Sequence, residues 1–236
     1  MDTEHNRRAF LSVAGTAVAA AAASTAAGQT PAVANPAGRV KIIAVNGSPR
    51  KGKTTAAALE ACLQAAREVS PRIETELIEL GGLKIDGSLV VPGAAPEGAT
   101  DDFPSLAPKL SDPSVGGIIV GAPVYFGSPP SLCKAFLERW MVFRKSNFPL
   151  SNKVAGVVAV GGARNGGQEL VIECIQAALM CHEMLIVGDG RPTAHRGATL
   201  WNNGKDDVSG DEFGLSTAKN LGRRVAEVAL RMAGSP

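Results

Sequence analysis

Three glycine-bearing loops constrain this chain most, because each directly follows a short apolar run. The runs cover residues 40–45, 116–121 and 153–160, and the loops after them cover residues 46–55, 123–127 and 161–167. Runs of this length, bounded by glycine and proline, are typical of buried strands. The carboxyl ends of parallel strands meet at one edge of a doubly wound sheet, where such sheets bind ligands. The pattern therefore predicts that the three loops converge on one site.

Strand and helix patterns alternate five times along the chain. We expect strands at residues 40–45, 73–80, 116–121, 153–160 and 184–187. We expect helices at residues 54–69, 101–110, 129–143, 168–181 and 212–232, with long loops at 81–99 and 188–210. This alternation predicts an α/β fold, in which helices cover both faces of a parallel sheet. With 236 residues, of which 45% are hydrophobic, the chain is long enough for one well-buried domain.

Residues 1–34, before the first strand, are interpreted as a targeting segment. Arg7 and Arg8 end a polar stretch, and a charge-free, alanine-rich run follows at residues 12–28. This arrangement resembles a twin-arginine export signal and predicts a signal peptide over residues 1–34, a folded domain over residues 35–236 and a periplasmic location. The alternative is a disordered or peripheral N-terminal helix on a cytoplasmic protein. An alanine-dominated run is a poor membrane span, so no stable span is expected.

The balance of charge argues against nucleic acid as a ligand, and the spacing of the cysteines argues against a metal site. The 24 Lys and Arg residues nearly balance the 22 Asp and Glu residues, and no basic tract is present, so nucleic acid is not an expected ligand. The four cysteines are Cys62, Cys133, Cys174 and Cys181, and no pair of them forms a C-x-x-C motif. They are interpreted as small packed residues, so no metal site is predicted.

The first loop admits two interpretations. Residues 47–54 match G-x-x-x-x-G-K-[ST], the phosphate loop of nucleoside triphosphatases, and they lie between a strand and a helix as that motif requires. Free N–H groups at a helix N-terminus attract phosphate under either interpretation. A triphosphatase also needs a carboxylate for Mg²⁺ at another strand end, and only Asp189 is a candidate. A P-loop enzyme is therefore the remote alternative.

The three loops together resemble those of the NADPH-dependent FMN reductase and iron–sulfur flavoprotein family. Residues 46–50 read N-G-S-P-R, residues 122–127 read A-P-V-Y-F-G, and residues 161–169 read G-G-A-R-N-G-G-Q-E. The resemblance covers the chain from Lys41 to the C-terminus. It implies a flavodoxin-like, doubly wound, five-stranded parallel sheet of order 2-1-3-4-5 with helices on both faces, and FMN as the cofactor.

The resemblance also implies a role for each loop. Hydroxyls in the first loop would bind the FMN phosphate and its cations would neutralise it, although a loop cation is often simply solvated; these residues are Ser48, Thr54, Thr55, Arg50 and Lys53. The second loop would lie along the flavin ring or, alternatively, form a hydrophobic plug; its residues are Pro123, Val124, Tyr125, Phe126 and Gly127. The third loop would approach the pyrimidine edge of the flavin, with Arg164 near the negative charge of the reduced ring. Alternatively, it forms a plain glycine turn. Its residues are Gly161, Gly162, Arg164, Asn165, Gly166 and Gly167.

By the same resemblance, the flavin N5 carries the chemistry and no catalytic side chain is expected. The implied activity is an FMN-dependent oxidoreductase with NAD(P)H as donor and a quinone-like acceptor, in a homodimer or homotetramer. The alternative is a flavin-binding electron carrier with a protein or quinol donor, which suits a periplasm without NAD(P)H. Residues 81–98 contain no cysteine where iron–sulfur members carry a cluster, so no Fe–S cluster is predicted. His195 and Trp201 lie in the long loop 188–210, as parts of a lid or subunit contact or as exposed side chains.

Overall fold

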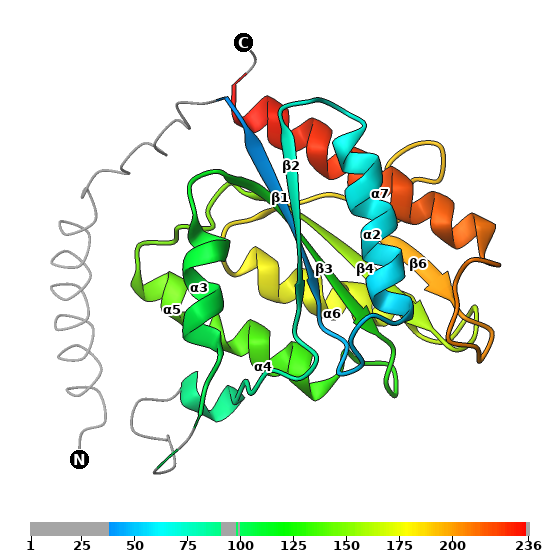
Figure 1. Ribbon diagram of the computed structural model, residues 1–236, viewed down its shortest axis with the longest axis horizontal. Coiled ribbons are helices and arrows are strands. Elements are labelled where there is room, and N and C mark those ends of the chain that lie inside the picture. The colour runs from blue at the N-terminus through cyan, green and yellow to red at the C-terminus, as the bar shows by residue number, and fades with distance from the viewer. Residues whose placement is uncertain (1–37, 91–97, 99, 235–236) are drawn as a thin grey trace, which may run out of the picture. The chain divides into compact units, whose positions relative to one another are not determined.

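The computed structural model describes residues 38–90, 98 and 100–234 (Figure 1). The interpretation of residues 1–34 as a signal peptide falls outside these residues. Among the described residues, no helix is both long enough and apolar enough to cross a membrane.

The core of the fold is a parallel sheet whose strands are ordered β2-β1-β3-β4-β5. The strands are β1 (Val40–Asn46), β2 (Ile73–Glu79), β3 (Val115–Pro123), β4 (Val154–Gly161) and β5 (Leu185–Ile186). Each strand of this path pairs in parallel with its neighbours. The order confirms the predicted flavodoxin-like topology. Because β2 and β3 lie on opposite sides of β1, the direction of winding reverses between β1 and β3, which is where doubly wound sheets bind ligands.

The outer position of the sheet is divided between two short strands. β5 pairs with the start of β4, and a further strand, β6 (Ala198–Trp201), pairs with its end from Val158 to Gly161. The prediction of residues 188–210 as one loop was therefore wrong for β6. Glycines at 188, 190 and 197 and Pro192 surround the strand with turn signals, and four residues are too few for a clear alternation.

Helices cover both faces of the sheet (Figure 1). Alternate β1 residues separate the two cores: Ile42 and Ala44 pack with α2 (Thr54–Arg67) and α7 (Glu212–Met232), whereas Ile43 and Val45 pack on the other face. That other face is covered by α3 (Phe103–Ser111), α4 (Ser131–Arg139), α5 (Met141–Lys145) and α6 (Gln168–Met180). The central strands β1, β3 and β4 are buried on both sides, which explains why their sequences are almost continuously apolar, whereas the outer strand β2 alternates and is half-buried.

Two predicted segments differ in detail from the structure. The helix expected at residues 129–143 is divided at Trp140 into α4 and α5, and the loop expected at 81–99 contains a short 3-10 helix, η1 (Gly87–Val90). Trp140 is fully buried, and its ring contacts those of Phe136 and Phe143 at centroid distances of 5.5 and 5.7 Å. The division therefore allows both helices to bury their aromatic side chains in one cluster.

Helices α2 and α7 approach each other through a glycine. A Cβ atom placed on Gly222 would lie 1.9 Å from the carbonyl oxygen of Cys62. No side chain fits at that distance, so the backbone of α7 lies directly against α2. This contact at Cys62 holds the middle of α2, whose first turn belongs to the site, against the longest helix of the fold.

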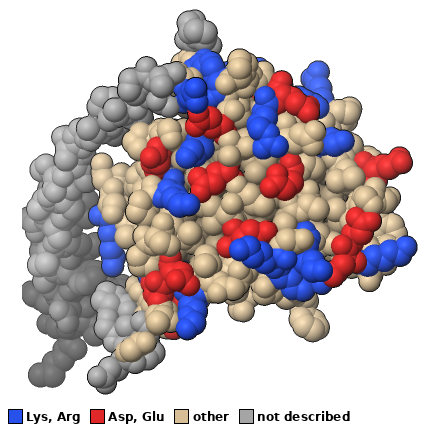
Figure 2. Space-filling model, in the orientation of Figure 1, with Lys and Arg blue, Asp and Glu red and all other residues tan. Residues whose placement is uncertain are grey.

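Acidic and basic side chains are both present over one face of the protein (Figure 2). On the face drawn in Figure 2, acidic and basic residues are interspersed, and no continuous basic area covers it. This distribution agrees with the nearly balanced sequence charge of +2.

Candidate functional site

The first loop is fixed by two side chains at the ends of β1 and β2. The buried Asn46 accepts a hydrogen bond from the backbone N–H of Ser48 at 3.0 Å and donates one to Glu79 at 2.6 Å. The other carboxylate oxygen of Glu79 accepts from the N–H of Gly52 at 3.0 Å. The N–H of Gly47 donates to the carbonyl of Gly121 at 2.7 Å, which joins the loop to β3. The loop is thus held in shape by protein groups before any ligand is considered.

Hydroxyl groups cluster where this loop enters α2. Ser48, Thr54 and Thr55 are all buried. The Ser48 hydroxyl accepts from the N–H of Arg50 at 3.1 Å, whereas the hydroxyls of Thr54 and Thr55 have no hydrogen-bond partner among the described residues. The first N–H groups of a helix also lack intrahelical partners. These donors suit an anion such as a phosphate.

The two cations of the first loop are paired with one carboxylate from a distant segment. Asp206, which follows β6, lies 2.6 Å from the guanidinium of Arg50 and 3.3 Å from the ammonium of Lys53. The hydrogen bond from Arg50, followed by that from Lys53, lowers the pKa of Asp206. The sequence predicted that these two cations face a phosphate. In the structure Asp206, which the sequence did not indicate, competes with a phosphate for both of them.

The second loop is a tight turn at the end of β3. Tyr125 and Ser128 exchange two backbone hydrogen bonds, of 2.9 and 3.1 Å, around Phe126 and Gly127, whose φ angles are +52° and +74°. Two central residues with positive φ are the mark of a type I′ turn. The turn leaves the Phe126 side chain fully exposed and that of Tyr125 half-exposed.

The third loop packs on the second. Gly167 has a φ of +101°, and a Cβ placed on it would lie 3.3 Å from the Cα of Gly127. A side chain here would combine a strained backbone with a tight contact, so the glycine allows the two loops to touch. Gln168 then begins α6, and its side chain donates to the carbonyls of Ala163 and Leu200. The predicted convergence of the loops is therefore present in the structure.

A cavity of about 340 Å³ lies where the three loops meet the end of β6. Its lining residues are Arg50, Thr54, Pro123, Val124, Tyr125, Val160, Gly161, Gly162, Asn202, Gly204, Lys205 and Asp206. The other predicted site residues lie in the loops but do not line it: Ser48, Lys53, Thr55, Phe126, Gly127, Arg164, Asn165, Gly166 and Gly167. The lining residues that the sequence did not predict are Val160, Asn202, Gly204, Lys205 and Asp206. The last four follow β6, and their position depends on that strand.

The cavity fits FMN in size and in the chemistry of its lining. Its volume is in the range of small-molecule sites, about 300–1,000 Å³. The lining residues Thr54 and Arg50 are suited to a phosphate, and the Thr54 hydroxyl has no protein partner in the described part of the chain. The lining residues Val124 and Tyr125, with the backbone at Gly161 and Gly162, provide an apolar and hydrogen-bonding surface for a planar ring.

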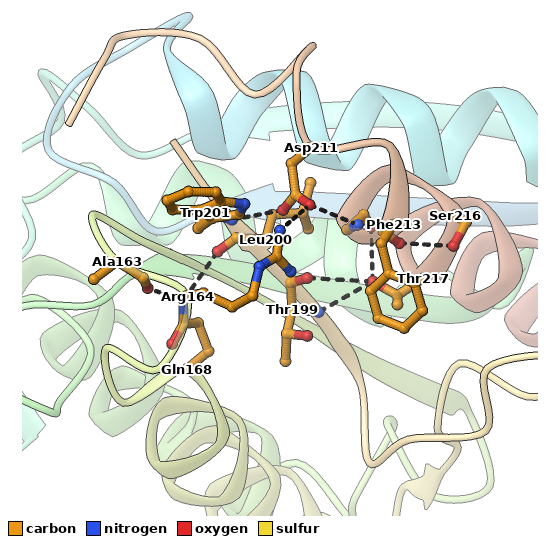
Figure 3. A network of polar contacts seen from close by, with 11 residues as sticks. Ala163, Arg164, Gln168, Thr199, Leu200, Trp201, Asp211, Phe213, Ser216 and Thr217 are labelled. Atoms are coloured by element: carbon orange, nitrogen blue, oxygen red, sulfur yellow. Dashed lines mark hydrogen bonds and ion pairs between the residues drawn. The ribbon is translucent and has the colours of Figure 1, made fainter. Parts of the chain in front are cut away.

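Arg164 does not line this cavity and takes part in a polar network (Figure 3). Its guanidinium lies 2.6 Å from the buried carboxylate of Asp211, at the start of α7, and 4.9 Å from the ring centroid of Trp201. Asp211 also accepts from the N–H groups of Trp201 and Gly214, at 2.9 and 3.0 Å. The charge of Arg164 is thus balanced within the protein.

His195 lies beside a separate cavity of about 600 Å³, bordered by Glu169, Gln176, Ile186, Gly188, Ala194, His195 and Arg196. Its Nδ1 atom is 3.2 Å from the fully buried carboxylate of Asp189, which also accepts from the His195 backbone and from Thr193. Asp189 was the only candidate for the Mg²⁺ carboxylate of a P-loop enzyme. Both of its oxygens bond within its own loop, so the structure gives that alternative no support.

The cysteines do not gather. Cys62 and Cys133 are buried, Cys174 and Cys181 are exposed, and burial raises the pKa of the Cys133 thiol to about 12. Burial likewise raises the pKa of Cys62. Among the described residues, no group of three or more His, Cys, Asp or Glu side chains is arranged to hold a metal ion.

Comparison with known proteins agrees with the geometry. The model of the family described as NADPH-dependent FMN reductase matches residues 40–199. An iron–sulfur flavoprotein of Methanocaldococcus jannaschii is 40% identical over 193 residues, which cover 80% of this chain and 97% of the relative. A protein of Chromohalobacter salexigens named NAD(P)H dehydrogenase (quinone) is 29% identical over 164 residues, or 60% of this chain and 77% of that protein.

Among solved structures, a WrbA-like flavodoxin protein from Agrobacterium tumefaciens aligns with a TM-score of 0.59 and 20% sequence identity. The alignment covers 81% of this chain and 98% of that structure, and at this identity it supports the fold. The family match spans more than half of the chain and includes all three loops. The chain therefore belongs to the NADPH-dependent FMN reductase family, as an FMN-dependent oxidoreductase.

Proposed function

We propose that this protein binds FMN in the 340 Å³ cavity and passes electrons from NAD(P)H to a quinone-like acceptor. The observation that carries the proposal is the convergence of the buried Thr54 at the start of α2 and of Tyr125 in the second loop on that one cavity. The name of the Chromohalobacter relative, NAD(P)H dehydrogenase (quinone), supports both the donor and the acceptor class.

The protein's part in this activity is binding and orientation. FMN, when bound, supplies electron transfer through N5 of its ring. The start of α2 holds the phosphate, and the backbone at Gly161 and Gly162 holds the ring edge. Tyr125 is 42% exposed, so the ring beside it remains open to a donor or acceptor from solvent. No side chain is assigned to proton transfer.

The test is the visible spectrum of the purified chain under anaerobic conditions. A bound flavin should give two visible bands that bleach when NADH or NADPH is added and return when a soluble benzoquinone follows. Bleaching by a reduced quinone but by neither nicotinamide would replace the proposed donor with a quinol, as in the carrier alternative. A colourless protein that takes up no added FMN would overturn the proposal.

The active protein contains FMN without an Fe–S cluster, although several relatives are named iron–sulfur flavoproteins. The support is in the sequence, where residues 81–98 contain no cysteine, and in the dispersed positions of the four cysteines. Iron and acid-labile sulfide analysis of anaerobically purified protein tests this. One equivalent of FMN with no sulfide is expected, and stoichiometric sulfide would contradict it.

Export by the twin-arginine route is part of the same proposal and rests on Arg7 and Arg8 and the run that follows them. Residues 1–34 fused to a fluorescent reporter should direct it to the periplasm. Replacing both arginines with lysine should retain the reporter in the cytoplasm. Equal export of the two fusions, or of neither, would refute the route.

The protein assembles as a homodimer or homotetramer. Exposed apolar side chains favour this: Met141 and Val142 on α5 are each 41% exposed, and Met180 at the end of α6 is 58% exposed. A hydrogen bond from Arg144 to the Cys181 carbonyl holds these two helix ends together. Sedimentation equilibrium of the purified protein should give a mass of two or four chains, and a monomer at micromolar concentration would contradict the proposal.

A further inference from the structure

The buried carboxylate of Asp211 joins three parts of the chain (Figure 3). One oxygen accepts from Arg164 in the third loop at 2.6 Å and from the N–H of Gly214 in α7 at 3.0 Å. The other accepts from the N–H of Trp201 at the end of β6 at 2.9 Å. The Asp211 side chain is only 2% exposed, so these partners rather than water satisfy its charge.

Three further hydrogen bonds link the same elements, and one of them joins two residues of the cavity lining. The side chain of Gln168 donates to Ala163 in the third loop at 2.6 Å and to Leu200 in β6 at 3.2 Å. The N–H of Asn202 donates to the carbonyl of Gly161 at 3.0 Å, and both of these residues line the cavity. The start of the third loop and the end of β6 therefore contribute jointly to the cavity lining, and Asp211 joins the same two segments.

The network also sets the charge near that lining. Arg164 follows the lining residue Gly162 by two positions, and its guanidinium lies over the ring of Trp201 at 4.9 Å. A free cation here would favour the reduced flavin, which carries more negative charge than the oxidised form. The carboxylate of Asp211 at 2.6 Å cancels much of that field.

We propose that Asp211 is a positioning residue for the flavin site, which holds Arg164 and Trp201 in place and balances the Arg164 charge. The inference rests on the proposed binding of FMN. Asp211, at the start of α7, lies outside the three loops. By this inference it nevertheless controls the reduction potential of the bound flavin.

The test compares wild-type protein with Asp211→Asn, Arg164→Gln and the double variant, each loaded with FMN. Asp211→Asn keeps the size of the side chain and removes its charge, so the midpoint potential should shift to a more positive value. Arg164→Gln removes the cation and leaves the carboxylate, so the potential should shift to a more negative value. The double variant should return close to wild type. Asp207→Asn is the matched control, because Asp207 is an exposed acid of the same segment whose side chain interacts with its near neighbours Ser209, Val208 and Lys205.

A second measurement does not depend on flavin. Hydrogen exchange of the Trp201 amide in the apoprotein should accelerate in Asp211→Asn and stay unchanged in Asp207→Asn. If the Asp211 and Asp207 variants shift the potential equally, or if the Trp201 amide exchanges at the wild-type rate in Asp211→Asn, the inference is wrong. Failure of the wild-type protein to bind FMN would instead overturn the proposed function, while the exchange experiment would still test the network.

Discussion

Asp206 and Arg50, which both line the cavity, form an ion pair of 2.6 Å although they are 156 positions apart in sequence. The pair joins the segment after β6 to the loop after β1, and Lys53 lies 3.3 Å from the same carboxylate. Because a phosphate would attract these two cations, Asp206 competes with it for them. Asp206 is thus a counterion for these two cations. A bound phosphate must either displace it or bind beside its negative charge.

We predict that Asp206→Asn tightens FMN binding a few-fold, because the cations are released and a repulsive charge is removed. Titration of apoprotein with FMN, followed by quenching of flavin fluorescence, measures the change. Riboflavin, which lacks the phosphate, should bind both proteins equally well, and Asp207→Asn should match wild type. Weaker FMN binding by Asp206→Asn would show that this carboxylate binds the ligand instead.

Thr54→Val should weaken FMN binding by about tenfold or more, because a hydrogen bond to a charged group contributes about 1.5–3 kcal/mol. The hydroxyl lines the cavity and has no other partner among the described residues, so its loss affects only the ligand. The same fluorescence titration measures the effect, with Ser111→Ala on α3 as the control. Affinity within twofold of wild type would place the phosphate elsewhere.

Phe126→Asn should raise the stability of the protein slightly and weaken its reaction with the acceptor. Phe126 has a φ of +52°, a conformation that asparagine tolerates better, and its side chain is fully exposed. A locally unfavourable residue at such a position indicates a functional role. Thermal unfolding should show an equal or higher Tm, whereas KM for a benzoquinone should rise. An unchanged KM would leave the ring without a role in the reaction.

The stability of the protein should depend on pH through Lys153. This lysine is buried, and its ammonium donates to the carbonyls of Asp112 and Val115 at 2.9 and 2.6 Å. Burial lowers its pKa from 10.5 to about 8. Between these values the unfolded chain binds more protons, so the free energy of unfolding should rise with pH by about 2–3 kcal/mol.

Urea unfolding between pH 7.5 and 10.5 should reveal this rise in the wild-type protein and a smaller one in Lys153→Met. The difference between the two proteins isolates Lys153 from other groups that titrate in the same range. Parallel curves for the two proteins would contradict the assignment.

Gly222→Ala should destabilise the fold by about 3 kcal/mol, a typical cost of overpacking, because its Cβ would meet the Cys62 carbonyl at 1.9 Å. Gly210→Ala is the matched control, since a Cβ there meets nothing within 4 Å. Urea denaturation measures both. Equal stability of the two variants would mean that α2 and α7 separate at little cost.

The sequence predicts the sheet order and the convergence of the three loops, because both follow from where apolar runs end. Asn46, Tyr125 and Gly161 each come at or just after a strand end, so their location needs only the strand pattern and the topology. Local residue types were sufficient here, since the backbone geometry of a strand end or turn depends on few neighbours.

The partners of the loop cations could not be predicted in this way. Asp206 and Asp211 reach Arg50 and Arg164 only because β6 pairs with β4, and β6 is too short and too close to glycine to be recognised. From sequence alone, an acidic residue in a long polar segment is expected to be exposed to solvent. Its role depends on contacts between residues far apart in sequence, which no local pattern encodes.

The divided outer strand offers a position for engineering. Ile186 pairs with Ala155 and Ala198 pairs with Val158, so both short strands pair with β4. Residues 188–197 connect the two strands outside the sheet. The base of this excursion is anchored by Asp189, and its tip at Arg191 and Pro192 is exposed. A peptide tag or a small reporter domain grafted at that tip would leave the hydrogen-bonding register of both strands intact.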